Sequence, residues 1–208
     1  MEKKGLFLVF EGIDGSGKTS QLKRTKEYLE ANGYDVVPTR EPGGTPISEK
    51  IRGLLLDPLN GEMDDRCELL LYGAARAQHL AEVILPAIRN GKAVLCDRFS
   101  LSTAAYQGYG RGISLELLEA VHSVAAFDVK PDLTLVVDVP VEVSAYRVAV
   151  SRGEPKDRLE KEKSDFFERV RQGFLSEAEK DDSIVVINGV QTEEQVFEDI
   201  KKALEKVL

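Results

Sequence analysis

Several residue types are scarce or absent in this 208-residue sequence. It has no tryptophan, two histidines and only two cysteines, Cys67 and Cys96, which stand without paired histidine spacing. This composition argues against a disulfide framework or a zinc site and is typical of reduced, buried cysteines in a cytoplasmic protein. No run reaches the roughly 18 apolar residues of a membrane helix, and no signal peptide precedes the first apolar run. We therefore expect a cytoplasmic protein without a membrane partner.

Positive charge is also in deficit. The 28 lysines and arginines are outnumbered by 36 aspartates and glutamates, which gives a formal net charge of −8. Because non-specific nucleic-acid binding requires a basic surface, we expect no nucleic-acid partner. An anionic ligand would have to be held by a local cluster of arginines and lysines. Neither a Cys–His nor a Ser–His–Asp arrangement can be argued from the sequence, so hydrolysis through a side-chain nucleophile has no support.

The most informative segment that is present is a glycine-rich loop, GIDGSGKT, at residues 12–19. It follows a short apolar run at 6–10 and precedes a helical pattern at 18–32, which is the setting of a phosphate-binding loop rather than an ordinary turn. The backbone N–H groups of such a loop point at phosphate oxygens, Lys18 can contact the β- and γ-phosphates, and Thr19 can bind Mg²⁺. The predicted phosphate-binding residues are Gly12, Ile13, Asp14, Gly15, Ser16, Gly17, Lys18 and Thr19.

Short apolar runs alternate with helical patterns along the whole chain. We predict strands at 6–10, 34–37, 93–96, 133–139 and 183–187. We predict helices at 18–32, 46–56, 65–90, 101–107, 114–127, 141–151, 159–180 and 192–207. This order predicts an α/β fold, a doubly wound parallel five-stranded sheet sandwiched by helices, as one domain over residues 1–208. Ligands of such folds bind at the carboxyl ends of the strands.

Charged residues follow two of the predicted strands at that edge. Asp97 ends the third strand and is the usual second anchor of Mg²⁺ in phosphate-loop proteins, while Arg98 could hold a phosphate with two hydrogen bonds. An aspartate that caps the next helix is the alternative. The segment REPGGT at 40–45 follows the second strand, and its glycines allow a close approach to a ligand. Arg52, in the next helix, fits a solvated helix face and a phosphate ligand equally well.

Other segments suggest a second ligand and a lid. Tyr72 and Arg76 share a helix face and could bind a base, although a core tyrosine beside an extended arginine is the commoner arrangement. The polar, glycine-rich segment 102–112 fits either nucleoside recognition or a packed surface loop. The cation-rich Gly-Pro segment near 148–159 predicts a lid over a transferring phosphoryl group, with a solvated turn as the alternative.

Three motifs in the same order resemble those of the bacterial thymidylate kinase family. They are FEGIDGSGKT at 10–19, REPGGT at 40–45, and DRF at 97–99 with STAAYQG at 102–108. The resemblance runs along nearly the whole chain. It implies a P-loop nucleoside monophosphate kinase fold, ATP as phosphoryl donor, Mg²⁺ as cofactor, dTMP as acceptor and a homodimer.

The same resemblance implies a role for individual residues. The implied dTMP-binding residues are Asp14, Arg52, Tyr72, Arg76, Arg98, Ser102, Tyr106 and Gln107, with Tyr72 stacked on thymine and Tyr106 excluding a ribose 2′-hydroxyl. The implied metal-binding residues are Thr19 and Asp97. The implied catalytic residues are Lys18, Arg98, Arg152 and Asp14.

One arrangement in the family supplies an arginine from the phosphate loop, and the other supplies it from the lid. Gly15 occupies the loop position here, so the chain resembles the second arrangement, with Arg152 as the implied lid arginine. Arg147 is implied to flank the adenine of ATP and joins the predicted cofactor-binding residues. Which of Arg147, Arg152 and Arg158 bridges the two phosphates stays open, since the lid is slightly longer than the common form.

Two other functions remain to be weighed. A kinase for another monophosphate, such as dUMP or dGMP, would use the same chemistry with a different fit around Tyr72 and Phe99. A regulatory or assembly ATPase would need no second nucleotide pocket, so the set of Asp14, Tyr72, Arg76 and Tyr106 argues against it.

Overall fold

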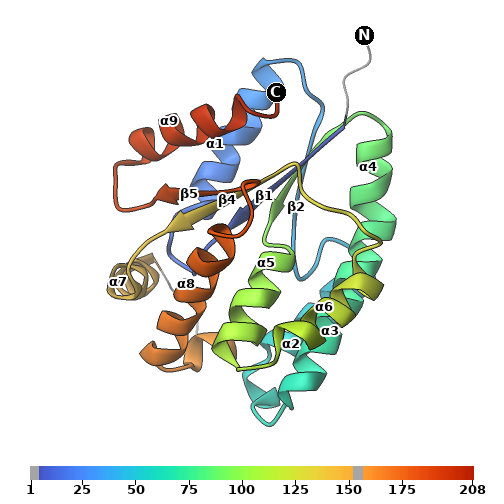
Figure 1. Cartoon of the computed structure of the whole chain (residues 1–208), viewed down its shortest axis with the longest axis vertical. Helices are drawn as coiled ribbons and strands as arrows, with labels where there is room; N and C mark the ends of the chain where they lie inside the picture. Colours follow the sequence, from blue (N-terminus) through green and yellow to red (C-terminus); the bar gives the residue numbers. More distant parts are fainter. Residues whose placement is uncertain (1–4, 152–156) are drawn as a thin grey trace.

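The computed structural model describes residues 5–151 and 157–208, and this part of the chain forms a five-stranded parallel sheet in the order β2-β3-β1-β4-β5. The strands are β1 (Leu6–Glu11), β2 (Val36–Arg40), β3 (Ala93–Asp97), β4 (Leu133–Asp138) and β5 (Ile184–Asn188). β1 is buried along its whole length, as a strand covered on both faces must be. The predicted α/β fold is confirmed (Figure 1).

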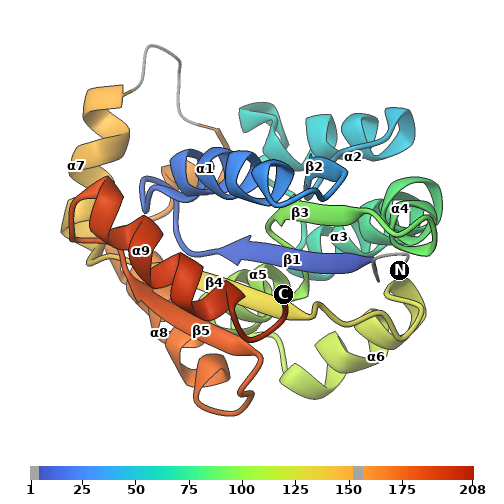
Figure 2. The ribbon, with the colours of Figure 1, turned by 90° about the horizontal axis from the view of Figure 1, so that it is seen from above.

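Helices cover both faces of the sheet (Figure 2). They are α1 (Lys18–Ala31), α2 (Pro46–Leu56), α3 (Asp65–His79), α4 (Leu85–Arg89), α5 (Ser100–Thr103), α6 (Leu115–Ala125), α7 (Val141–Ser151), α8 (Ser164–Ala178) and α9 (Glu193–Leu204). One hydrophobic cluster joins α1 and α9 to one sheet face through Leu29 and Ile200, and a second joins α4 to the other face through Ala87, together with Ala126 directly after α6. A third cluster packs α8 against the end of β4.

Several predicted boundaries were wrong. The second strand runs on through Pro38 to Arg40 instead of ending at 37. Because β2 is the edge strand beside β3, a proline without an N–H is tolerated there. The predicted helix 65–90 is divided into α3 and α4 by a π-helical turn at Leu80–Ile84, and another π-helical turn, Ala104–Gly110, continues α5.

The strand register brings three chain segments to one point. Asp97 pairs with Phe10 of β1 on one side and with Arg40 of β2 on the other. Beyond the strands, the Arg98 N–H donates to the Phe10 carbonyl at 2.8 Å, and the Glu41 N–H donates to the Asp97 carbonyl at 2.9 Å. The segments that follow β1, β2 and β3 therefore start side by side. Across the described ranges, 5–151 and 157–208, no helix has the length and apolarity to cross a membrane.

Candidate functional site

The phosphate loop wraps around the ammonium group of Lys18. Lys18 Nζ donates to the carbonyls of Gly12 at 2.9 Å and Ile13 at 3.0 Å. Gly12 has a φ of 128°, and a Cβ there would lie 2.4 Å from the Val137 carbonyl oxygen, so only glycine fits. Burial, helped by the Arg98 charge, lowers the pKa of Lys18 to about 8. The loop thus presents a buried cation at the N-terminus of α1, where an anion is favoured.

Asp97 and Thr19 line the same cleft as the loop. The Asp97 Oδ1 atom is buried and has no hydrogen-bond partner among the residues that the structure describes. A buried, unsatisfied carboxylate oxygen requires a partner, and a hard cation bound by oxygen ligands fits that requirement. These two residues therefore fit the predicted Mg²⁺ site.

Arg98 lies where the loop and a second cavity meet. Its φ is 71°, a left-handed conformation that is unusual for a residue with a side chain. The guanidinium donates to Asp14 Oδ1 at 2.7 Å and to Ser102 Oγ at 3.1 Å, and it lies 5.2 Å from the centre of the Tyr106 ring. The strained turn after β3 therefore directs the Arg98 guanidinium across the edge of the sheet.

Every substrate-binding residue predicted from the sequence lines that second cavity, here called the acceptor cavity. They are Asp14, Arg52, Tyr72, Arg76, Arg98, Ser102, Tyr106 and Gln107. Phe99 and Pro42 also line it, and Arg52 donates to the Pro42 carbonyl at 2.9 Å. Burial strongly raises the pKa values of the Tyr72 and Tyr106 hydroxyls, so both rings are neutral and suited to stacking or packing.

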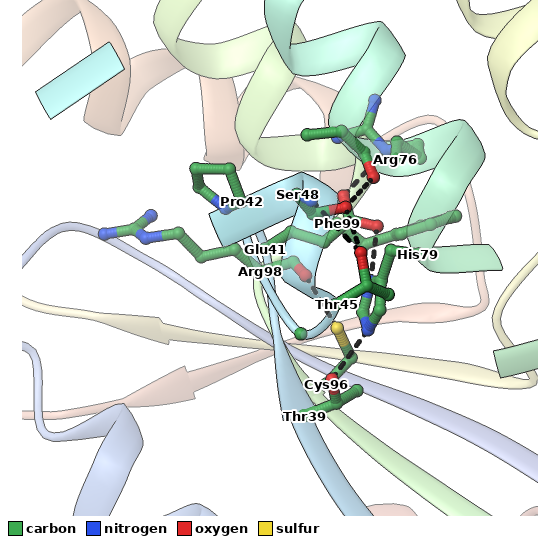
Figure 3. Close-up of polar contacts among 12 residues, drawn as sticks. Thr39, Glu41, Pro42, Thr45, Ser48, Arg76, His79, Cys96, Arg98 and Phe99 are labelled. Atoms are coloured by element: carbon green, nitrogen blue, oxygen red, sulfur yellow. Dashed lines mark hydrogen bonds and ion pairs between the residues drawn. The ribbon is translucent and has the colours of Figure 1, made fainter. Parts of the chain in front are cut away.

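The commoner arrangement for this pair, a core tyrosine beside an arginine that extends to solvent, is not observed for Tyr72 and Arg76. The Arg76 side chain is 3% exposed and forms an ion pair with Glu41, with 2.8 Å between Nε and Oε2. Nη2 donates to Thr103 Oγ1 at 3.0 Å. The guanidinium lies 5.0 Å from the centre of the Phe99 ring (Figure 3). Arg76 is thus a buried, fixed donor at the wall of the acceptor cavity.

The sequence did not identify three buried glutamates that support the site. Glu11, at the end of β1, accepts from the Phe99 N–H at 2.8 Å, the Ser102 N–H at 3.1 Å and the Ser102 hydroxyl at 2.5 Å. Burial raises the pKa of Glu11 to about 7. Glu41 holds Arg76, and Glu68 accepts from Gln107 at 2.7 Å. A glutamate that directly follows an apolar run was the available signal for Glu11.

The three arginines around the predicted lid have different surroundings. Arg152 lies outside the described residues. Arg147, on α7, donates to the carbonyls of Gly189 at 3.1 Å and Gly15 at 3.4 Å, so it bridges the phosphate loop and the turn after β5. Arg158 is buried against Glu68 and donates through Nε to the Leu55 carbonyl at 2.8 Å. Arg158 therefore faces α2 and α3 and not the phosphate loop.

Comparison with known proteins agrees with this geometry. The model of a family described as thymidylate kinase matches residues 10–200. The chain belongs to the thymidylate kinase family. A thymidylate kinase of Pelotomaculum thermopropionicum is 53% identical over 206 residues, which cover 99% of this chain and 95% of the relative. One from Desulforapulum autotrophicum is 49% identical, covering 98% of this chain and 92% of that protein.

A solved structure places the fold in the same family. The crystal structure of thymidylate kinase from Ehrlichia chaffeensis is 36% identical and superimposes with a TM-score of 0.77, covering 96% of this chain and 98% of that one. The P-loop kinase fold that the sequence predicted is therefore confirmed. This member of the thymidylate kinase family combines that fold with the phosphate loop, the acceptor cavity and the arginine between them.

Proposed function

We propose that this protein transfers the γ-phosphoryl group of ATP to dTMP, forming dTDP and ADP for dTTP synthesis. The observation that carries the proposal is the junction of two cavities. The phosphate-loop cleft and the acceptor cavity share Asp14, Arg52 and Arg98 in their walls. A donor phosphate held by the loop and an acceptor phosphate held by the arginines would then meet at this junction.

The residues at the junction suit phosphoryl transfer. The reaction depends on alignment and on neutralising negative charge more than on covalent help. The phosphate of dTMP, with a second pKa of about 6, is largely dianionic at neutral pH and needs no strong base. Arg52 and Arg98 would hold this phosphate, Lys18 would bind the donor phosphates, and Asp14 would reach the 3′-hydroxyl of the sugar.

The acceptor cavity suits a thymine nucleotide. Tyr72 would stack on the base, and Arg76 and Ser102 would donate to it. Tyr106 would fill the space of a 2′-hydroxyl and so exclude ribonucleotides, and Gln107 would contact the nucleotide beside it. A kinase for dUMP remains the second candidate, because it requires only a looser fit around the thymine methyl group.

The remaining parts of the proposal concern the donor side. Thr19 and Asp97 would hold Mg²⁺, which would neutralise negative charge on the donor phosphates. Arg147 would flank the adenine, since it lies between the loop and Gly189. Arg152 would act as the lid arginine over the phosphates, within a single kinase domain whose lid lies near 148–159.

The proposal also includes a cytoplasmic homodimer. Leu70 on α3 is 60% exposed and Val124 on α6 is 79% exposed, and these two helices pack against each other. Exposed apolar side chains on one pair of helices are typical of an association surface. Sedimentation of the purified chain would give a mass of two subunits, and Val124→Lys would return a monomer.

ADP production from ATP and Mg²⁺ with dTMP, dUMP, UMP, dCMP, AMP or dGMP tests the reaction. A strong preference for dTMP supports the proposal. ATP turnover that ignores the monophosphate would mean that only the donor half of the site has been identified, which is the behaviour of a regulatory ATPase.

A further inference from the structure

Arg76 is held by a chain of buried polar side chains that leads away from the acceptor cavity. Glu41 Oε2 accepts from Arg76 Nε at 2.8 Å, and Glu41 Oε1 lies 3.1 Å from His79 Nδ1. His79 Nε2 in turn lies 2.6 Å from Thr39 Oγ1 (Figure 3). Arg76, Glu41 and His79 are 3%, 5% and 0% exposed, so water does not compete for these contacts.

The chemistry of the partners fixes the direction of these hydrogen bonds. A carboxylate only accepts, so His79 Nδ1 must carry a hydrogen and donate it to Glu41. In the neutral ring Nε2 then accepts the hydroxyl hydrogen of Thr39. The carboxylate of Glu41 is thereby held from two sides, by the arginine and by the imidazole, and it cannot rotate without losing one of them.

The backbone around His79 leaves room for this chain of contacts. Gly44 has a φ of 82°, and a Cβ at that position would lie 2.6 Å from His79 Nε2 and 2.7 Å from Thr39 Oγ1. A side chain at residue 44 would therefore displace the imidazole from the threonine. His79 and Arg76 lie one turn apart on α3, so the same helix carries the arginine and the group that secures its partner.

We propose that Glu41, His79 and Thr39 form a positioning brace for Arg76, and that this brace sets which pyrimidine base the acceptor cavity accepts. The inference rests on the proposed function. A guanidinium has only donors, so it can bind the 4-carbonyl oxygen of thymine but faces an unfavourable donor on the 4-amino group of cytosine. A guanidinium held in one position therefore favours thymine over cytosine. A mobile guanidinium can rotate away from the 4-amino group, so that cytosine also binds.

The test compares kcat/KM for dTMP with kcat/KM for dCMP. In Glu41→Gln, an NH2 group replaces one of the two carboxylate oxygens and cannot accept from the donor of Arg76 or His79 that faces it, so we expect the dTMP/dCMP ratio to fall about tenfold. Glu82→Gln, on the exposed face after α3, is the matched control and should keep the wild-type ratio.

Variants of His79 distinguish a role in positioning Arg76 through Glu41 from a role in packing alone. His79→Leu fills the space but donates nothing, so the ratio should fall as in Glu41→Gln. His79→Asn places an amide donor near the position of Nδ1 and should restore most of the ratio. Equal losses of kcat/KM for dTMP and dCMP in Glu41→Gln and His79→Leu would overturn the brace and leave the dTMP kinase assignment intact.

A milder change guards against variants that fail to fold. Thr39→Val keeps the shape of a half-buried side chain and removes only the hydroxyl that secures the imidazole. We expect the dTMP/dCMP ratio to fall about threefold with the melting temperature nearly unchanged. A wild-type ratio in Thr39→Val would exclude Thr39 from the brace. A wild-type enzyme that does not prefer dTMP would instead refute the proposed function itself.

Discussion

The Arg158 guanidinium is paired with the Glu68 carboxylate, and both side chains are almost completely buried. Glu68 also accepts from Gln107, which lines the acceptor cavity, and it forms a 3.3 Å ion pair with Arg111. The end of the predicted lid is thus attached to α3 through one carboxylate. This ion pair distinguishes Arg158 from a phosphate-binding arginine, although its position in the sequence near a predicted lid fits either role.

The first prediction concerns stability. Removing one partner of a buried ion pair leaves an uncompensated charge and costs about 3–5 kcal/mol. Because Glu68 keeps Arg111 and Gln107 as donors, we expect Arg158→Leu to lower the free energy of unfolding by about 2–3 kcal/mol. Urea denaturation measures this change. Full stability with a kcat reduced a hundredfold or more would instead identify Arg158 as a catalytic residue.

A second prediction follows from the burial of Lys18, which lowers its pKa to about 8. At pH 8.5 the free enzyme is partly deprotonated at Lys18, and bound phosphates raise the pKa again by favouring the ammonium form. Binding of ATP with Mg²⁺ should therefore take up protons between about pH 8 and 9. Calorimetric titrations in buffers of different ionisation enthalpy measure the uptake, and Lys18→Arg, which stays charged, should abolish it.

The third prediction concerns Glu11, which makes the free energy of unfolding depend on pH. Its pKa is raised from 4.5 to about 7, chiefly by burial, so between these values the folded protein binds a proton that the unfolded chain lacks. The stability from this proton is fully present below pH 4.5 and is lost as the pH rises through 7. Relative to Glu11→Gln, the wild type should lose at most about 1.4 kcal/mol per pH unit across this range. Parallel pH profiles for the two proteins would contradict the assignment.

The parts of the fold that sequence reasoning predicted are those with local causes. Alternation of apolar runs with helical patterns predicted the parallel sheet, and the spacing of glycines from Gly12 to Gly17 predicted the loop, because both patterns arise from neighbouring residues. The resemblance supplied the acceptor residues, and the structure brings them to one cavity. Spacing alone did not decide whether Arg52 binds a phosphate or is solvated. It also did not decide whether Tyr72 binds a base or packs in the core.

Sequence reasoning did not reach the partners of buried charges. Glu41 and Arg76 are 35 residues apart, and Glu68 and Arg158 are 90 apart, so no local pattern links them. The second strand was predicted to end at 37, before Pro38, because the position of β2 at the sheet edge is a property of the whole fold. Both kinds of error come from contacts that only the tertiary structure creates.

The last prediction concerns the metal. Asp97 Oδ1 is buried without a hydrogen-bond partner in the part of the chain described, so its charge is available to a cation. Asp97→Asn keeps the size of the side chain but removes that charge, and we expect the Mg²⁺ concentration for half-maximal ADP production to rise at least about tenfold. Asp138→Asn is the control, since Asp138 ends β4 at the same edge of the sheet and is already paired with Arg171 at 2.8 Å. An unchanged Mg²⁺ dependence in Asp97→Asn would show that the cation is held without Asp97.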